Sequence, residues 1–275
     1  MRKTLILILL LCASLLLPAC ARAEGGLEVT FLNIGKADAI LLRTANSAAL
    51  IDTGTNKNGK QLLKWLTAEG VEALDLLVIT HYDKDHVGGA DRILESLPVR
   101  RVLNPAYHKD SKQYTQYMDA LSAAGITPEM LDANITFELD GLRYDVDVAN
   151  ADFYGDDEEN DFSLVLRVTA GERVFLFAGD AENPRLGELL DEGGLAADVL
   201  KVPHHGRFED LSPAFFEAVG AQYGVITSSD EEPEDELVVE LLREAGTEPL
   251  LTREGTVVIT TDGSSLEVKQ LGPED

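Results

Sequence analysis

Two histidines and two aspartates lie within six positions of one another, directly after a strongly apolar run. The apolar run covers residues 74–79 and is typical of a buried strand, and the polar residues are His81, Asp83, Asp85 and His86. Neutral imidazole and carboxylate groups are ligands for divalent ions such as zinc and manganese. Two glycines follow, and they allow the backbone to turn sharply. The segment therefore predicts a metal site at the end of a buried strand.

Two further strand ends carry the same kinds of side chain. An apolar run at residues 198–202 leads to His204 and His205, and another at residues 174–178 leads to Asp180. Four of the five histidines in the chain lie in two of these turns. A role as an ordinary turn carboxylate is the weaker explanation of Asp180, even when that residue is taken alone. Together, the three turns predict a site that binds two metal ions.

The motifs occur in an order that resembles the metallo-β-lactamase superfamily. The more specific similarity is to the extracellular hydrolase domain of the bacterial competence (DNA-internalisation) proteins. This resemblance implies an α/β fold, the αββα metallo-β-lactamase sandwich, over nearly the whole mature chain. The segments that carry it are residues 31–42, 50–54, 81–89, 160–166, 179–180 and 201–206.

The resemblance implies six metal ligands. They are His81 and Asp83 for one ion, Asp85 and His86 for the other, Asp180 as the bridge between them, and His205 as a late ligand. Asp85 is also the candidate catalytic residue, either as a ligand or as a general base that orients the attacking water.

One histidine of the superfamily pattern, the middle one, is missing from this chain. The matching segment offers only Asn160 or Ser163, and which of the two replaces it stays open. The ligand set is therefore richer in oxygen than a three-histidine zinc site. We expect two divalent ions. Imidazole ligands suit zinc, whereas harder oxygen ligands shift the preference toward manganese, so we hold the two metals equal.

Several other polar residues are weaker candidates for contact with a substrate. Arg207 is equally well explained as a solvated cation and Asp38 can be explained as a turn residue, and for His108, in a probable loop, the surface explanation is the stronger one. These residues are Asp38, Asn160, Ser163, His204, Arg207 and His108.

The expected function is metal-dependent hydrolysis, with a metal-bound hydroxide attacking a phosphodiester, as in a phosphodiesterase or nuclease. The alternatives are a hydrolase of another ester or a lactone, or a non-catalytic metal-binding module, which the missing histidine would suit. A β-lactamase role is disfavoured because Asp83 replaces a histidine. The chain has 23 basic and 49 acidic residues, a net charge of −26, which argues against tight non-specific DNA binding.

The N-terminus has the pattern of a targeting segment. A basic pair precedes an apolar run from Leu5 to Leu17, too short to span a bilayer comfortably, and a small-residue site ends at Ala23. We expect a signal peptide over residues 1–23 and one metallo-β-lactamase-fold domain over residues 24–275. The chain is then exported, to a secreted or extracytoplasmic location. A competing interpretation makes Cys20 a lipid-bearing residue, which would anchor the protein to a membrane.

Both cysteines of the chain, Cys12 and Cys20, fall within the predicted signal peptide. The mature domain is therefore expected to have no disulfide bond and no thiolate metal ligand.

Apolar periodicity and turn residues predict an alternation of strands and helices. Helices are expected at residues 59–69, 89–97, 111–124, 184–190, 213–219 and 234–245. Strands are expected at 27–32, 37–43, 48–51, 74–79, 101–103, twice within 135–148, and at 162–168, 174–178, 198–202, 225–227, 256–261 and 266–268, with a loop at 152–161.

Overall fold

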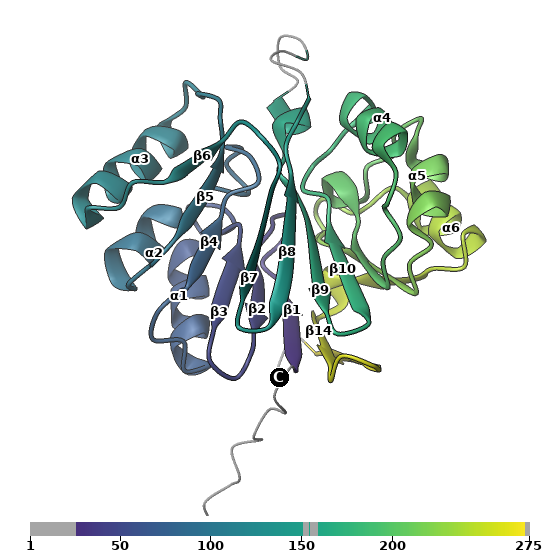
Figure 1. Ribbon diagram of the computed structural model, residues 1–275, viewed down its shortest axis with the longest axis horizontal. Coiled ribbons are helices and arrows are strands. Elements are labelled where there is room, and N and C mark those ends of the chain that lie inside the picture. The colour runs from purple at the N-terminus through teal and green to yellow at the C-terminus, as the bar shows by residue number, and fades with distance from the viewer. Residues whose placement is uncertain (1–25, 151–153, 155–158, 273–275) are drawn as a thin grey trace, which may run out of the picture.

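Two β-sheets pack face to face in a computed structural model that describes residues 26–150, 154 and 159–272 (Figure 1). The first sheet has the strand order β15-β14-β1-β2-β3-β4-β5-β6. Its strands from β15 to β3 pair antiparallel, and those from β3 to β6 pair parallel. In chain order they are β1 (Leu27–Phe31), β2 (Ile40–Arg43), β3 (Ala48–Ile51), β4 (Leu76–Val78), β5 (Val102–Pro105), β6 (Glu129–Leu131), β14 (Thr256–Thr261) and β15 (Leu266–Leu271).

The second sheet has the strand order β13-β12-β11-β10-β9-β8-β7. Strands β7 to β10 pair antiparallel, and β10 to β13 pair parallel. They are β7 (Ile135–Leu139), β8 (Leu142–Asp147), β9 (Val165–Ala170), β10 (Arg173–Phe177), β11 (Val199–Lys201), β12 (Tyr223–Ile226) and β13 (Glu248–Leu251).

Helices cover the outer face of each sheet (Figure 1). On the first sheet lie α1 (Gly59–Ala68), α2 (Ala90–Ser96) and α3 (Lys112–Ala124), and on the second α4 (Asn183–Glu192), α5 (Ser212–Val219) and α6 (Glu236–Glu244). Short 3-10 turns η1 (Glu159–Phe162), η2 (Pro203–Gly206) and η3 (Thr252–Glu254) lie in the connections. This layering confirms the predicted αββα sandwich.

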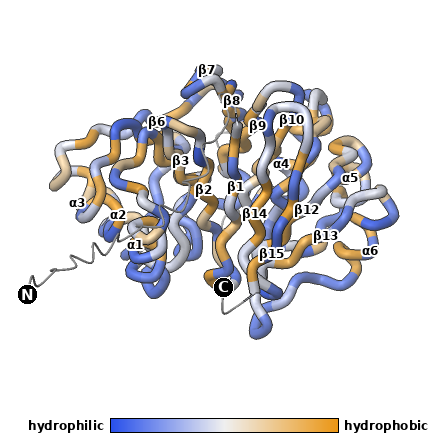
Figure 2. The backbone as a smooth tube through the Cα atoms, turned by 90° about the horizontal axis from the view of Figure 1, so that it is seen from below, coloured by the Kyte–Doolittle hydropathy of each residue, from blue (hydrophilic) through white to orange (hydrophobic). Residues whose placement is uncertain are grey.

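Three apolar layers hold the sandwich together. One lies between the two sheets, where residues such as Phe31 and Phe177 stack with ring centroids 6.1 Å apart. The other two lie between each sheet and its helices, through residues such as Leu66 of α1 and Phe215 of α5. Figure 2 shows the apolar strands gathered in the middle of the molecule, with hydrophilic turns around them. Among the described residues, no helix has both the length and the apolar character needed to cross a bilayer.

Most predicted elements are present, and the departures have local causes. Strands β6 and β13 were not predicted, because they are short and contain a polar or proline residue in place of an alternating apolar pattern. Strand β9 begins at Val165, since Phe162, expected to start it, is the last residue of the η1 turn and residues 163–164 connect the two. The predicted loop at 152–161 lies mostly outside the described residues, as do the predicted signal peptide and Cys20.

The strand directions decide where the polar turns meet. Parallel strands present their carboxyl ends at one edge of a sheet. In the first sheet β3 and β4 run parallel, and in the second β10, β11 and β12 run parallel. The turns that follow these strands come together at one edge of the sandwich.

The glycine pair of the first turn is required by close backbone packing. A Cβ at Gly88 would lie 2.2 Å from the carbonyl oxygen of Lys84 and 2.6 Å from the amide nitrogen of Asn56. Both contacts are with backbone, which cannot move aside. Gly187, within α4, would meet only the Leu211 side chain at an ordinary 3.5 Å.

We therefore expect Gly88→Ala to lower the free energy of unfolding by about 2–3 kcal/mol, because the loop must distort. Gly187→Ala, the matched control, should raise it by about 0.5–1 kcal/mol, because alanine is the better helix former. Urea denaturation measures both values. Equal effects of the two substitutions would contradict this account of the loop.

Candidate metal centre

The turn after β4 is fixed to the first sheet by its own backbone. The amides of His86 and Val87 donate to the carbonyl of Asp83, which folds the turn back on itself. The carbonyl of His86 accepts hydrogen bonds from the amide and the hydroxyl of Thr53, at 2.7 and 2.8 Å. The amide of Asp38 donates to the carbonyl of Asp85. His81 and His86 are thus held at defined positions, and both are fully buried.

The second sheet supplies its side chains through two turns with left-handed backbone. Gly179, with φ of 54°, turns the chain after β10 and presents Asp180. After β11, His204 and His205 have φ values of 47° and 54°, a region that residues with a Cβ rarely adopt. Such backbone persists only where surrounding contacts fix it, and it is common at functional sites.

Three ligand atoms form a small triangle where the two sheets meet. The Nε2 atoms of His86 and His205 are 3.3 Å apart, and Asp180 Oδ2 lies 3.2 and 3.1 Å from them. Two ligands that are each about 2.1 Å from one ion, at tetrahedral or octahedral angles, stand about 3.0–3.4 Å apart. The three atoms therefore have the spacing of ligands that share one cation.

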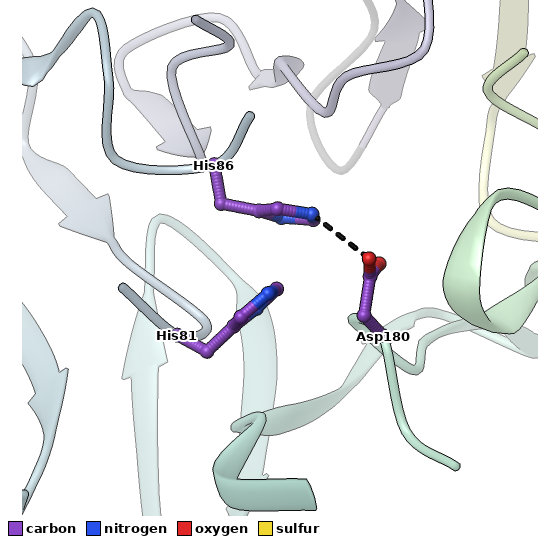
Figure 3. Close-up of side chains that lie close together, drawn as sticks. All are labelled: His81, His86 and Asp180. Atoms are coloured by element: carbon purple, nitrogen blue, oxygen red, sulfur yellow. Dashed lines mark ion pairs between the residues drawn. The ribbon is translucent and has the colours of Figure 1, made fainter. Parts of the chain in front are cut away.

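Further ligand atoms flank the triangle on both sides. On one side, Asp85 Oδ2 lies 3.7 Å from His205 Nε2. On the other side, His81 joins His86 and Asp180, as Figure 3 shows, with the three ligand atoms within 4.8 Å of one another. Two overlapping groups of ligands thus flank the triangle, one made by Asp85, His86 and His205 and the other by His81, His86 and Asp180. A third group of described residues, Asp38, Asp52 and His86, lies at the Nδ1 side of His86.

His81 has a buried nitrogen that the protein leaves without a partner. Its Nε2 makes no hydrogen bond, while Nδ1 contacts the hydroxyls of Thr80 and Ser163 at 3.1 and 3.4 Å. Burial, together with the neighbouring His86, lowers the pKa of His81 to about 4. The imidazole is therefore neutral at pH 7. A neutral imidazole with an unpaired buried nitrogen fits a metal ligand.

Carboxylate and carbonyl groups orient the other two imidazoles. His86 Nδ1 donates to Asp52 at 2.8 Å, and His205 Nδ1 donates to the carbonyl of Thr227 at 2.9 Å. Because these partners accept the Nδ1 proton, each Nε2 is left with its lone pair toward the triangle. Histidine ligands in metalloproteins are usually held by such outer hydrogen bonds. Although burial alone would lower it, Asp180 and Asp52 raise the pKa of His86 well above its ordinary value, so without a metal these carboxylates favour a second proton on Nε2, the proton that a bound ion would replace.

A buried ammonium group holds the far side of Asp180. Lys201 Nζ lies 3.3 Å from Asp180 Oδ1, 2.6 Å from Asp38 Oδ2 and 2.9 Å from the carbonyl oxygen of Gly179. Burial would raise the pKa of Asp180, but His205, His86 and Lys201 hold it well below its usual range. Asp180 is therefore an anion, with Oδ1 on Lys201 and Oδ2 free to face the imidazoles.

The remaining candidates lie outside the triangle. Asp83 is paired with Lys109 at 2.5 Å, and Lys109 also pairs with Glu159, so the structure does not bring Asp83 into either ligand group. His204 faces Glu182, with 3.1 Å between its Nδ1 and Oε1 of the glutamate. Asp38 is buried at the centre beside Lys201.

Of the two candidates for the missing histidine, Ser163 is the nearer to the centre. Its hydroxyl accepts from the amide of Asp180 at 3.1 Å and contacts His81. Asn160 instead donates to Glu182 at 2.9 Å. His108 and Arg207 are exposed, and His108 packs edge-on against the ring of Tyr114.

Sequence reasoning assigned no role in the centre to Asp52 or Lys201. Asp52 had a usable signal, since it directly follows strand β3 just as His81 follows β4. Lys201 lies inside a buried strand, and a lone lysine there gave no sign of its partner.

A family model confirms the resemblance. The model for the metallo-β-lactamase superfamily matches residues 32–227. The chain belongs to this superfamily. Among curated relatives, ComE operon protein 3 of Bacillus subtilis is 26% identical over 76% of the chain and 29% of that protein. Competence protein ComA of Neisseria gonorrhoeae is 30% identical over 74% of the chain and 27% of that protein.

The present chain spans less than a third of the length of these two competence relatives. A solved structure with the same fold is the metallo-β-lactamase fold protein YhfI from Bacillus subtilis. It has a TM-score of 0.56 and 10% identity, and the match covers 82% of this chain and 95% of that one. The histidine and aspartate clusters of the present chain indicate a metal site within that fold.

Asp52 allows a direct test of how the imidazole is held. We expect Asp52→Asn to weaken metal binding by about 10–100-fold, because an amide group facing His86 Nδ1 can no longer accept its proton firmly. Asparagine tolerates the left-handed backbone of this position, where φ is 58°, so the fold should survive. Calorimetric titration with Mn²⁺, after a chelator has removed any bound metal from the protein, measures the affinity. Unchanged affinity in a folded variant would show that this hydrogen bond does not support the ligand.

Proposed function

We propose that the protein is a metal-dependent phosphodiesterase or nuclease with a dinuclear centre. It is a member of the metallo-β-lactamase superfamily, whose members are typically metal-dependent hydrolases. The observation that carries the proposal is the triangle of His86, His205 and Asp180, with Asp85 on one side and His81 on the other.

The two ligand groups divide between two ions. Asp85, His86 and His205 would hold one ion, and His81 would hold the other, with Asp180 shared. Lys201 lies against Oδ1 of Asp180, so this lysine would hold the carboxylate in place while Asp180 helps to bind the ions. The ions would supply a hydroxide at neutral pH and stabilise negative charge on a phosphoryl group.

Side chains and a backbone carbonyl of the protein would orient the attacking water and hold the protons of the histidine ligands. Asp85 is less enclosed than the other carboxylates of the centre, with 17% of its side chain exposed, which suits contact with an attacking water. Asp52 and Thr227 keep the Nδ1 protons of His86 and His205, so the opposite nitrogens stay available.

The ligand set does not favour one metal strongly. Imidazole nitrogens suit zinc, whereas the carboxylate oxygens that replace further histidines suit manganese. We therefore propose Zn²⁺ or Mn²⁺; Asp83, whose Oδ1 pairs with Lys109, lies in neither ligand group and would have to move to join one.

A phosphodiester is the substrate class that the similarity to competence proteins supports. The net charge of −26 opposes tight, non-specific binding of a long polyanion. A small phosphodiester or a nucleic-acid end therefore suits the chain better than extended duplex DNA.

Hydrolysis of a chromogenic phosphodiester tests the proposal. We expect turnover with Mn²⁺ or Zn²⁺, no turnover after chelation, and a loss of at least about 100-fold in Asp85→Asn and Asp180→Ala, since both residues serve the reacting centre. Asp119→Asn, an exposed carboxylate on α3, is the matched control and should be fully active.

Two outcomes would contradict the phosphodiesterase proposal. Folded, metal-loaded protein without turnover would point to another ester or lactone, or to a metal-binding module that does not catalyse. Full activity in Asp180→Ala would place the reaction elsewhere in the molecule.

We also propose export, on the basis of the N-terminal sequence, which lies outside the described residues. We expect mass spectrometry of protein purified from the extracytoplasmic fraction to give a chain that begins at Glu24. A lipid-modified Cys20 as the first residue would instead indicate membrane anchoring. A full-length chain confined to the cytoplasm would refute export in either form.

A further inference from the structure

A second group of metal-ligand side chains lies beside the candidate centre. It consists of Glu182, His204 and Glu209, whose ligand atoms all lie within 4.8 Å of one another. Glu182 directly precedes α4, His204 lies in η2, and Glu209 lies in the loop before α5. None of the three is among the ligands proposed for the dinuclear centre, and the rings of His204 and His205 are 6.4 Å apart.

His204 brings a buried nitrogen into this cluster without a hydrogen bond. The residue is only 6% exposed, and its Nδ1 meets no acceptor at hydrogen-bond angles, although it lies within ion-pair distance of Glu182. The same atom lies 3.1 Å from Glu182 Oε1 and 3.9 Å from Glu209 Oε1. Buried polar groups are nearly always paired, so this nitrogen calls for an explanation. A close approach without hydrogen-bond geometry is what two ligands of one ion show, since both point at the ion rather than at each other.

The two carboxylates are held in place by neutral groups. Asn160 donates to Glu182 Oε1 at 2.9 Å, and Asn183 donates to Glu209 Oε2 at 2.7 Å. Among the residues that the structure describes, neither carboxylate forms an ion pair with lysine or arginine. Burial and the nearby Glu182 raise the pKa of Glu209. The asparagines thus fix two carboxylates close together without neutralising their charge.

We propose that Glu182, His204 and Glu209 bind a further divalent cation, distinct from those of the dinuclear centre. One imidazole and two carboxylates form a ligand set that suits zinc or manganese, with water completing the coordination. Binding here goes beyond the proposed function, because it requires only these three side chains. Such an ion would neutralise the two negative charges of Glu182 and Glu209 beside the centre, which favours the approach of an anionic substrate.

Metal stoichiometry tests this site independently of catalysis. Protein freed of metal by a chelator is titrated with Mn²⁺, and the equivalents of Mn²⁺ bound per protein molecule are counted. Glu209→Gln should lose one equivalent, or bind it at least about 10-fold more weakly, while the equivalents held by the centre remain. Glutamine still offers an oxygen to Asn183, so the loop should keep its structure. Glu217→Gln, an exposed residue on α5, is the matched control and should bind as the unmodified protein does.

Cadmium-113 NMR of the Cd²⁺-loaded protein separates this site from the centre. We expect one resonance to disappear in Glu209→Gln and in Glu182→Gln, and the same resonance to persist in Asp180→Ala, in which signals of the centre are lost. Failure of the proposed dinuclear centre would leave this resonance in place. Identical stoichiometry and identical spectra in the unmodified protein, Glu209→Gln and Glu182→Gln would overturn the proposal, leaving a simple pair of His204 with Glu182.

Discussion

A single buried ammonium group ties the two sheets together at the centre. Lys201 belongs to β11 of the second sheet, and Asp38 lies in the turn between β1 and β2 of the first, with 2.6 Å between their charged atoms. Burial would lower the pKa of Lys201, but Asp38 and Asp180 raise it, so the side chain stays charged. Removing one partner of such a buried pair typically costs about 3–5 kcal/mol. Lys201 therefore fixes the sheets relative to each other and fixes Asp180 with the same three contacts.

The buried carboxylates around Lys201 outnumber the buried cations that could balance their charge. Asp38, Asp52 and Asp180 are all buried within this network, while Lys201 is the one lysine among them. An excess of buried negative charge is costly unless cations compensate it. Protonation of His86 offers partial compensation, and a divalent ion offers more. The centre is thus built so that metal binding relieves an electrostatic cost that folding creates.

The convergence of His81, His86, Asp180 and His205 could be predicted because each follows an apolar strand, and parallel strands end at a common edge. The contacts of Asp83 could not, because its partner Lys109 comes from the segment after β5, and nothing in the spacing of the two residues reveals their pairing. Lys201 lies in a segment that carries the resemblance, but its contacts with Asp38 and Asp180 could not be predicted, because nothing in the sequence links the three residues. The αββα layering followed from the resemblance, whereas β6 and β13 are too short and too polar to stand out.

The acidic character of the chain makes substrate attraction depend on metal as well. With a net charge of −26, the protein repels anions at long range, although salt screens this beyond about 8–10 Å. The two lysines of the centre do not counter it, because Lys109 is paired with Asp83 and Glu159 and Lys201 with Asp38 and Asp180. Bound ions would then be the main source of positive potential for the phosphoryl group of the proposed substrate, beside the exposed side chain of Arg207. Loss of metal would therefore remove the attraction for the substrate together with the chemistry, and binding and turnover should fall together.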